Sequence, residues 1–390
     1  MKTVERSDEL KKVKFGNTNM MVTEVCAGTM TWGSFNGEEK EAHDQLDALW
    51  KIGVNFYDTA ELYPVAFNYG KTTEEWIGNW LENKMKDNAL KREEIYIATK
   101  CNPAGIGGVG EQKKHGYEPK TLMASCKASL ERLKCDYIDL YQLHWPCRDL
   151  PVFGPASYQN IRDGRNSAVN KGEPETFDQQ VLSVKALFDA GLIKHWGLSN
   201  ENAYGITMFC LACDRLGVPR PVSNQNDFSL NNRTYESDTL EACYRFGLVG
   251  LPYGPLSGGT LTGKYDFPEY AHEEDRALSI CRHNKDKNFQ PRYMNPMARE
   301  ATKKYVALAK KYGITPTELA LAWANSCWYN ASVIIGTTTV RQVEECVGAF
   351  KITLPEELLK QIDEIHEEYR NPASIYVDAD LCLQAPWLKK

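Results

Sequence analysis

The sequence lacks several features that mark other classes of protein. No uninterrupted apolar run approaches the length of a membrane span, and the first residues, Met1 to Glu5, are polar and contain no apolar signal core. No Gly-x-Gly-x-x-Gly motif follows the first predicted strand, so the fingerprint of an open dinucleotide-binding sheet is missing. These absences argue against a membrane protein and against that nucleotide-binding fold, and we expect a cytoplasmic protein.

A strong charge of one sign and clustered metal ligands are missing as well. The 390 residues include 46 Lys and Arg and 52 Asp and Glu, which gives a formal net charge of −6. This mildly acidic balance argues against nucleic acid or an anionic membrane as the main partner. The 7 histidines are spread apart, and no Cys-x-x-Cys pair stands near a second pair or a histidine pair, so we expect no metal site. The 12 cysteines stand in apolar stretches, and we expect them to be small core residues in a reducing compartment.

The sequence does contain a regular alternation of short apolar segments and helical segments. The short segments are apolar on both faces, which is typical of a parallel sheet covered by helices. Strands are predicted at 25–29, 54–57, 95–99, 137–143, 193–198, 221–225, 248–251 and 333–335. Helices are predicted at 38–52, 72–86, 120–133, 176–190, 203–216, 234–246, 299–312, 317–326 and 340–350. Eight such units predict an α/β fold of the closed (β/α)8 or TIM barrel type.

A hairpin is predicted before this barrel, with long loops at its mouth and a tail behind it. Segments 13–15 and 21–23 flank a turn at Gly16-Asn17-Thr18. We predict one domain over residues 1–390, with the barrel at about 13–350 and a tail at 351–390 that begins with a helix at 355–369. Long irregular segments follow predicted strands and would lie over the C-terminal mouth, where such loops are usually functional; they are 102–117, 146–174 and 266–297.

Four polar residues stand at corresponding places behind successive predicted strands. Asp58 follows the second strand and Tyr63 comes five residues later, while Lys100 ends the third strand and His144 the fourth. Taken singly, each has an ordinary interpretation as a turn, surface or packing residue. Because the carboxyl ends of barrel strands converge on one mouth, all four are predicted to share one site.

These residues lie in longer motifs that resemble those of the aldo-keto reductase family. The similarity runs from about Val13 to Phe350 and is closest to the bacterial Tas-type branch, with the potassium-channel β-subunit branch as a neighbour. It implies a (β/α)8 barrel that binds NADPH in an extended pose across its mouth and interconverts carbonyls and alcohols. The motifs are Asn55-Phe56-Tyr57-Asp58-Thr59-Ala60-Glu61-Leu62-Tyr63, Leu143-His144-Trp145-Pro146, Gly197-Leu198-Ser199-Asn200, Tyr253-Gly254-Pro255-Leu256-Ser257-Gly258-Gly259 and Ile335-Gly336-Thr337-Thr338.

By this resemblance, Tyr63 is the general acid, Asp58 and Lys100 tune it, and His144 orients the substrate carbonyl. A free phenol has a pKa of about 10 and exchanges protons poorly near neutral pH. A neighbouring ammonium favours the phenolate, so we expect Lys100 to lower the pKa of Tyr63, while Asp58 keeps Lys100 charged and in position. A neutral His144 would donate a hydrogen bond to the developing alkoxide.

The same resemblance implies a set of residues that bind NADPH or NADP+. Ser199, Asn200 and Gln225 match positions that bind the nicotinamide carboxamide, although such side chains at strand ends also cap helices. Tyr253 matches the aromatic residue that stacks on the nicotinamide ring; its alternative role is core packing. The implied set is Gly28, Thr29, Met30, Asp58, Ser199, Asn200, Gln225, Tyr253, Gly254, Pro255, Leu256, Gly258, Lys264, Gly336, Thr337, Thr338, Gln342 and Glu345.

The resemblance also assigns the two ends of the cofactor site. Lys264 and the turn that begins at Gly336, together with Arg341, lie where the family holds the adenosine 2′-phosphate; cations and a helix N-terminus suit a dianion and favour NADPH over NADH. Gln342 stands where many relatives carry arginine, and Cys346 where asparagine is usual.

At the substrate end, two tryptophans are predicted to lie beside a small-molecule carbonyl substrate. Trp32 and Trp145 would form aromatic walls next to Tyr63 and His144, which suits apolar or aromatic carbonyls. Packing of either tryptophan beneath a loop is the alternative.

Two other functions remain alternatives. A redox-sensing module that holds NADP(H) and regulates a partner, as in the channel-subunit branch, is compatible with intact catalytic residues. A metal-dependent barrel hydrolase would need carboxylate or histidine clusters at strand ends, and the sequence contains none. The oligomeric state is left open.

Overall fold

The predicted strands form one parallel sheet that curls into a barrel. The computed structural model describes residues 4–65, 72–103, 116–148, 176–272, 281–286 and 290–374, and the strand order is β10-β9-β8-β7-β6-β5-β4-β11. The two edge strands meet through the chain before β11, because Gly250 N donates to Tyr329 O at 2.8 Å and Ala331 N to Gly250 O at 2.9 Å. The predicted barrel class is confirmed. The strands are β4 (Val25–Gly28), β5 (Phe56–Asp58), β6 (Tyr96–Cys101), β7 (Ile138–Leu143), β8 (Ile193–Ser199), β9 (Ser223–Gln225), β10 (Val249–Gly250) and β11 (Val333–Gly336).

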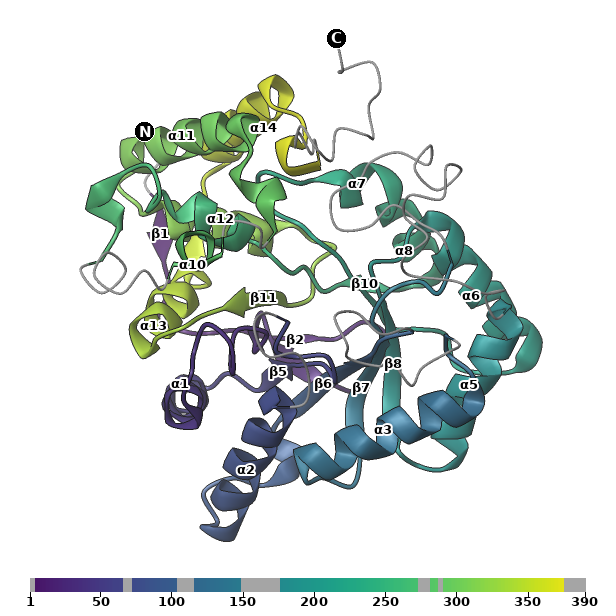
Figure 1. The fold of residues 1–390 in the computed structure, drawn as a ribbon. Helices are drawn as coiled ribbons and strands as arrows, with labels where there is room; N and C mark the ends of the chain where they lie inside the picture. The colour runs from purple at the N-terminus through teal and green to yellow at the C-terminus, as the bar shows by residue number, and fades with distance from the viewer. Residues whose placement is uncertain are drawn as a thin grey trace.

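Helices follow the strands and surround the sheet (Figure 1). Most of the predicted segments 102–117 and 146–174, part of 266–297 and the end of the tail lie outside the described residues. The helices that cover the barrel and the tail helix are α1 (Glu39–Ile52), α2 (Thr72–Lys86), α3 (Pro119–Leu133), α5 (Phe177–Asp189), α6 (Ala203–Leu216), α7 (Thr234–Asp238), α8 (Leu240–Phe246), α11 (Pro296–Lys311), α12 (Pro316–Ser326), α13 (Val340–Ala349) and α14 (Glu356–Glu368).

Local sequence signals explain where several helices begin and end. α1 ends at Gly53 and α6 at Gly217, which adopt φ values of 97° and 66° in the left-handed region that glycine tolerates best. α12 begins with a capping box, in which Thr315 Oγ1 accepts from Glu318 N at 3.1 Å and Thr315 N donates to Glu318 Oε2 at 2.8 Å. These signals fix the ends of the helices, and β5 begins soon after α1 ends.

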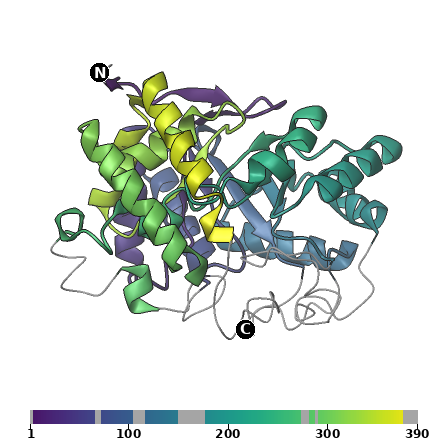
Figure 2. The same ribbon diagram turned by 90° about the horizontal axis from the view of Figure 1, so that it is seen from above.

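The hairpin of β2 (Lys12–Lys14) and β3 (Met21–Thr23) closes the amino-terminal end of the barrel. Phe15, Met20 and Val22 are buried against side chains from inside the barrel, and the rings of Phe15 and Phe56 meet edge to face with centroids 5.3 Å apart. Figure 2 shows the amino-terminal chain along one side of the molecule. Since this end is filled by apolar side chains, a ligand must approach from the opposite end.

Two local features differ from the sequence prediction. The predicted helix 234–246 is broken into α7 and α8 at Thr239, whose Oγ1 donates to Asp238 Oδ2 at 3.1 Å. Asp and the β-branched Thr are weak helix formers, so a helix is easily interrupted where they adjoin. In addition, β1 (Glu5–Arg6) pairs antiparallel with β12 (Ile352–Thr353), a contact between distant short segments that has no local sequence pattern.

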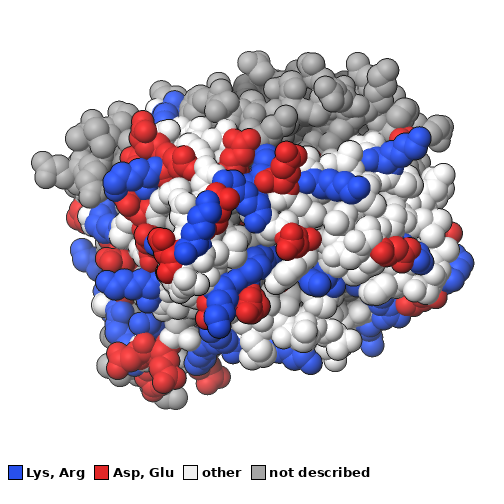
Figure 3. Space-filling model, turned by 90° about the horizontal axis from the view of Figure 1, so that it is seen from below, with Lys and Arg blue, Asp and Glu red and all other residues white. Residues whose placement is uncertain are grey.

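The surface of the described residues carries both signs of charge. Acidic and basic side chains are interspersed across the face drawn in Figure 3. Ion pairs join neighbouring helices, for example Lys84 Nζ with Asp47 Oδ1 at 2.7 Å and Lys134 Nζ with Glu82 Oε2 at 2.8 Å. Within the described part of the chain, no helix has the length and apolarity needed to cross a membrane.

Candidate active site

A cavity of about 720 Å³ lies at the carboxyl-terminal ends of the strands. Asp58, Tyr63 and His144 contribute to its wall, and Lys100 is fully buried beside them. The strands therefore bring the four predicted catalytic residues to one place. Other wall residues follow β4, β8, β9, β10 and β11, so the cavity extends across the mouth of the barrel.

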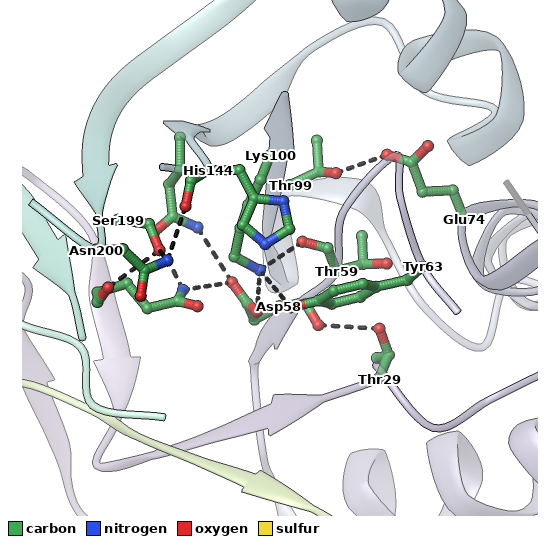
Figure 4. A network of polar contacts seen from close by, with 12 residues as sticks. Thr29, Asp58, Thr59, Tyr63, Glu74, Thr99, Lys100, His144, Ser199 and Asn200 are labelled. Carbon is green, nitrogen blue, oxygen red and sulfur yellow. Dashed lines mark hydrogen bonds and ion pairs between the residues drawn. The ribbon is translucent and has the colours of Figure 1, made fainter. Parts of the chain in front are cut away.

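The Lys100 ammonium is the centre of the polar contacts in this site (Figure 4). Its Nζ donates to Asp58 Oδ1 at 2.5 Å, to the Thr59 carbonyl oxygen at 2.8 Å and to Tyr63 Oη at 3.3 Å. An ammonium has three hydrogens and no lone pair, so these bonds use all its donors. Tyr63 accepts one of them, and its own hydroxyl hydrogen remains to be donated toward the cavity.

Burial and charge act in opposite directions on this pair. Burial raises the pKa of the Tyr63 phenol above its ordinary value, and the Lys100 ammonium offsets only part of the rise. Burial alone would lower the pKa of Lys100, but attraction to Asp58 and Tyr63 outweighs burial, so this pKa is raised. Both groups therefore hold their protons at neutral pH. The expected net lowering of the Tyr63 pKa is wrong here, because the sequence did not reveal how deeply the phenol is buried.

His144 lies next to Tyr63 in the cavity wall. The two rings meet edge to face with centroids 5.7 Å apart, and the Trp145 ring lies 4.8 Å from the His144 ring. The backbone fixes this position, since His144 N donates to the Cys101 carbonyl oxygen at 2.9 Å. An oxygen atom of a ligand between the two side chains could accept hydrogen bonds from both.

A chain of polar contacts links His144 to the predicted carboxamide-binding residues. Asn200 Nδ2 donates to His144 O at 2.8 Å and to Ser199 Oγ at 3.1 Å, and the Tyr253 hydroxyl donates to Asn200 Oδ1 at 2.8 Å. Gln225 Nε2 donates to Asp58 Oδ2 at 2.9 Å. These four residues line the same cavity, so the structure brings together the residues predicted for one end of the cofactor.

The glycine-rich segment behind β10 forms the next part of the wall. Gly254 and Gly258 adopt φ values of 67° and 64°, and a Cβ atom on either would lie 2.8 Å from a side-chain atom, of Tyr293 and His283 respectively. Glycine is therefore required at both positions by conformation and by space. Pro255 and Leu256 line the cavity with them, and a ligand can approach this backbone closely.

Basic residues lie along the far part of the cavity. Lys264 and Arg341 line it together with Gly336, Thr338, Gln342 and Glu345. Gln342 Oε1 accepts from Thr338 N at 2.9 Å and Thr338 Oγ1 at 3.1 Å, so its amide stabilises the turn behind β11. Gly28, Thr29 and Met30 complete the set of predicted cofactor residues in the wall.

Sequence reasoning missed Arg282, which belongs to the short helix α10 (Arg282–Lys285) and lines this cavity. Its guanidinium lies above the Phe35 ring, 5.7 Å from the centroid, and one of its nitrogens lies 3.6 Å from where a Cβ on Gly336 would be. Burial lowers its pKa, and no carboxylate of the described residues forms an ion pair with it. The surrounding sequence is irregular, and only the positive charge of the residue was a signal.

Two predicted site residues lie elsewhere. Trp32 is fully buried in the core between barrel and helices and is not part of the cavity wall, which corrects its predicted place beside a substrate. Thr337 is also buried, with its Oγ1 donating to Gln45 Oε1 at 2.8 Å, so its side chain points away from the cavity. In both cases neighbouring residues of the motif do line the cavity. The sequence alone could not show which side chains point into the cavity and which point into the core.

The architecture and the site agree with the comparisons to known proteins. The family model described as "Aldo/keto reductase family" matches residues 24–367. The chain belongs to the aldo/keto reductase family, a family of oxidoreductases that generally use nicotinamide cofactors, and the predicted resemblance is confirmed.

Relatives match over most of their length. The chain is 32% identical to Protein tas of Escherichia coli (strain K12) over 361 residues, which is 92% of this chain and 98% of that protein. It is 28% identical to the uncharacterized oxidoreductase YrpG of Bacillus subtilis over 352 residues, 90% of this chain and 94% of that protein. It is 27% identical to a probable voltage-gated potassium channel subunit beta of Oryza sativa subsp. japonica over 340 residues, 86% and 90% of the two chains.

Proposed function

We propose that this chain is an NADPH-dependent reductase of aldehydes and ketones, in which Tyr63 is the general acid. The observation that carries the proposal is the contact of Lys100 with both Asp58 and Tyr63 at the wall of the cavity. A phenol held in this way presents its hydrogen to the cavity, and a buried ammonium remains beside it to stabilise the phenolate left after proton transfer.

The residues in the cavity suit a nicotinamide dinucleotide. Amide and hydroxyl groups of Ser199, Asn200 and Gln225 lie near the acid, glycine backbone lies in the middle, and Lys264, Arg282 and Arg341 lie in the other part. Cations of this kind suit phosphate groups, which supports NADPH over NADH. When bound, the cofactor supplies hydride to the carbonyl carbon.

The protein's own groups would supply the rest of the reaction. Tyr63 and His144 orient the carbonyl oxygen, which develops negative charge as the carbon accepts hydride. Tyr63 gives its proton to that oxygen, the alcohol leaves, and the phenolate next to Lys100 recovers a proton from solvent. Leu62, Val65 and Trp145 line the cavity close to Tyr63 in sequence or space, which supports substrates with an apolar or aromatic group.

The proposal is tested by following the oxidation of NADPH with a panel of aldehydes, ketones and quinones. We expect turnover with aromatic aldehydes and much weaker turnover with NADH. Tight binding of NADP+ without turnover of any compound would contradict the reductase and support the alternative of a redox-sensing module. Loss of turnover on treatment with a chelator would contradict a mechanism that needs no metal.

A further inference from the structure

Gln142 is a buried polar residue in the interior of the barrel that does not line the cavity. It lies in β7, and none of its surface is exposed. Burial of an amide is unfavourable unless its hydrogen bonds are made. Its partners therefore explain why this strand tolerates a buried amide.

Both of its polar atoms bind residues of the site. Gln142 Nε2 donates to Asp58 Oδ2 at 3.1 Å, and its Oε1 accepts from Gln225 Nε2 at 3.1 Å. Gln225 Nε2 also donates to Asp58 Oδ2 at 2.9 Å. The three side chains form a closed triangle of hydrogen bonds, on the same carboxylate that Figure 4 shows bound to Lys100. They come from β5, β7 and β9, alternate strands of the sheet, as is usual for one layer inside a barrel.

The triangle has only one possible polarity. A carboxylate only accepts hydrogen bonds, so both amides must turn their Nε2 groups toward Asp58. The Gln142 oxygen then receives the second hydrogen of Gln225 Nε2, and both hydrogens of that group are used. The side-chain carbonyl oxygen of Gln225 accepts no hydrogen bond from the described residues, and Gln225 lines the cavity, so this oxygen is available to a ligand. Gln142 thus controls how Gln225 is presented, although it does not touch the cavity itself.

We propose that Gln142 is a positioning residue for the proposed reduction. It binds Asp58, which holds Lys100 against Tyr63, and it fixes the Gln225 amide with its oxygen toward the nicotinamide carboxamide. The inference rests on the proposed function. Gln142 thereby connects the residues proposed to bind the cofactor with those proposed to hold the proton donor. Neither the sequence motifs nor the relatives assigned Gln142 to one of these groups.

The test uses two variants, of which only one should respond to pH. Gln142→Met keeps the size of the side chain and removes both hydrogen bonds. In Gln142→Glu, the neutral carboxyl group can donate to Asp58 and accept from Gln225, so it replaces the amide. The ionised form cannot donate and repels Asp58, which raises the apparent pKa of this carboxyl pair above the ordinary value of about 4.3.

We expect the Kd for NADP+ and the rate of reduction to respond in parallel. Gln142→Met should lower kcat about tenfold at every pH, since a hydrogen bond to a charged group is lost. Gln142→Glu should be close to wild type at the lowest pH at which the protein is stable, and should lose activity and NADP+ affinity as the pH rises to 8. A purely structural role would give losses independent of pH in both variants, and that result would overturn the inference.

Tyr141→Phe is the matched control. Tyr141 is the neighbouring residue in β7, is equally buried, and faces the outer core, where its hydroxyl has no hydrogen-bond partner among the described residues. We expect this variant to match wild type at all pH values. If Gln142→Met does not fold, the activity of Gln142→Glu at low pH is compared with its activity at high pH. A loss at high pH still supports the positioning role, and equal activities contradict it.

A cofactor analogue separates this inference from the proposed function. The 3-acetylpyridine analogue of NADP+ lacks the amide hydrogens that an acceptor at Gln225 would bind. We expect wild type to bind NADP+ several-fold more tightly than this analogue, and Gln142→Met to lose the preference. If wild type binds neither, the proposed function fails and the inference fails with it. If wild type binds and reduces as expected but the variants keep the preference, only the role of Gln142 is wrong.

Discussion

The Tyr253 hydroxyl donates to the Asn200 amide oxygen at 2.8 Å, and the same amide donates to the His144 carbonyl oxygen at 2.8 Å. One asparagine therefore connects the ring predicted to stack on nicotinamide with the backbone of the residue predicted to orient the substrate. Asn200 adopts a φ value of 56°, in the left-handed region where asparagine is one of the few tolerated residues. The geometry makes the cofactor side and the substrate side of the cavity dependent on each other.

The first prediction concerns this contact. Tyr253→Phe keeps the aromatic ring but removes its hydrogen bond to Asn200. A typical hydrogen bond contributes about 0.5–1.5 kcal/mol of free energy. We expect the Kd for NADP+, measured by quenching of protein fluorescence, to rise about 2–10-fold. Tyr244→Phe is the control, because Tyr244 is largely exposed on α8. Equal affinities for wild type and Tyr253→Phe would mean that the hydroxyl does not position the ring.

The second prediction concerns the choice between NADPH and NADH. Arg282 lines the cavity near Gly336, and Gln342 supplies no charge to the turn behind β11. Arg282→Met should weaken NADPH about 10–100-fold, the effect of losing a hydrogen bond to a charged group, and leave NADH nearly unchanged.

Lys285→Met is the control for this prediction. Lys285 belongs to the same short helix but donates to the Ser34 carbonyl oxygen at 3.1 Å and is not part of the cavity wall. Calorimetric titration of the variants with both cofactors gives the two affinities. An equal loss for NADPH and NADH would show that Arg282 does not distinguish them.

The third prediction is the alkaline side of the pH profile. The acid must be protonated to act, and the pKa of Tyr63 is raised above its ordinary value of about 10 by burial. We expect the single-turnover rate of reduction to stay level from neutral pH to about pH 9. Stopped-flow measurement with saturating cofactor and substrate tests this. A tenfold fall between pH 7 and 9 would contradict the raised pKa.

The fourth prediction concerns stability behind the site. Glu74 in α2 is fully buried; it accepts from Thr99 Oγ1 in β6 at 2.6 Å and from Arg132 Nε in α3 at 2.7 Å. Burial raises the pKa of Glu74 despite these partners. Its folded-state pKa thus lies above the unfolded value of about 4.3, so its contribution is greatest below that pH and is lost as the pH rises through the folded pKa.

Removal of Arg132 should enlarge this effect. Arg132→Met leaves a buried carboxylate without its cation, and we expect a loss of about 3–5 kcal/mol in the free energy of unfolding at pH 8. The loss should be smaller at pH 5, because Glu74 can then be protonated. Urea denaturation at both pH values tests this, with Lys134→Met as a partly exposed control on the neighbouring C-cap. A loss of the same size at both values would show that Glu74 does not titrate in this range.

Much of this architecture could be predicted from the sequence because local sequence patterns determine where the strands and helices lie. An apolar pattern defines the strand that contains Lys100, and a glycine stop at Gly53 defines the end of α1. The convergence of Asp58, Tyr63, Lys100 and His144 followed from their places at strand ends in a barrel, and the structure places all four together.

The parts that were missed depend on direction and burial, which sequence patterns do not contain. Trp32 and Met30 lie in one short motif, but only Met30 reaches the cavity. Arg282 comes from an irregular segment whose path over the cavity no periodicity predicts. The sign of the Tyr63 pKa shift depended on burial that competes with the ammonium. Gln142 shares its strand with the polar Asp139, and its role could be seen only from the positions of Asp58 and Gln225.

The central claim is that Tyr63, held by Lys100, gives the proton to the substrate oxygen. The most direct measurement is the single-turnover rate of carbonyl reduction in Tyr63→Phe compared with wild type, with the Kd for NADPH measured on the same samples. We predict an unchanged Kd and a rate lower by about 10²–10⁴-fold, the usual contribution of a positioned acid. A rate within a few-fold of wild type at unchanged affinity would contradict the claim.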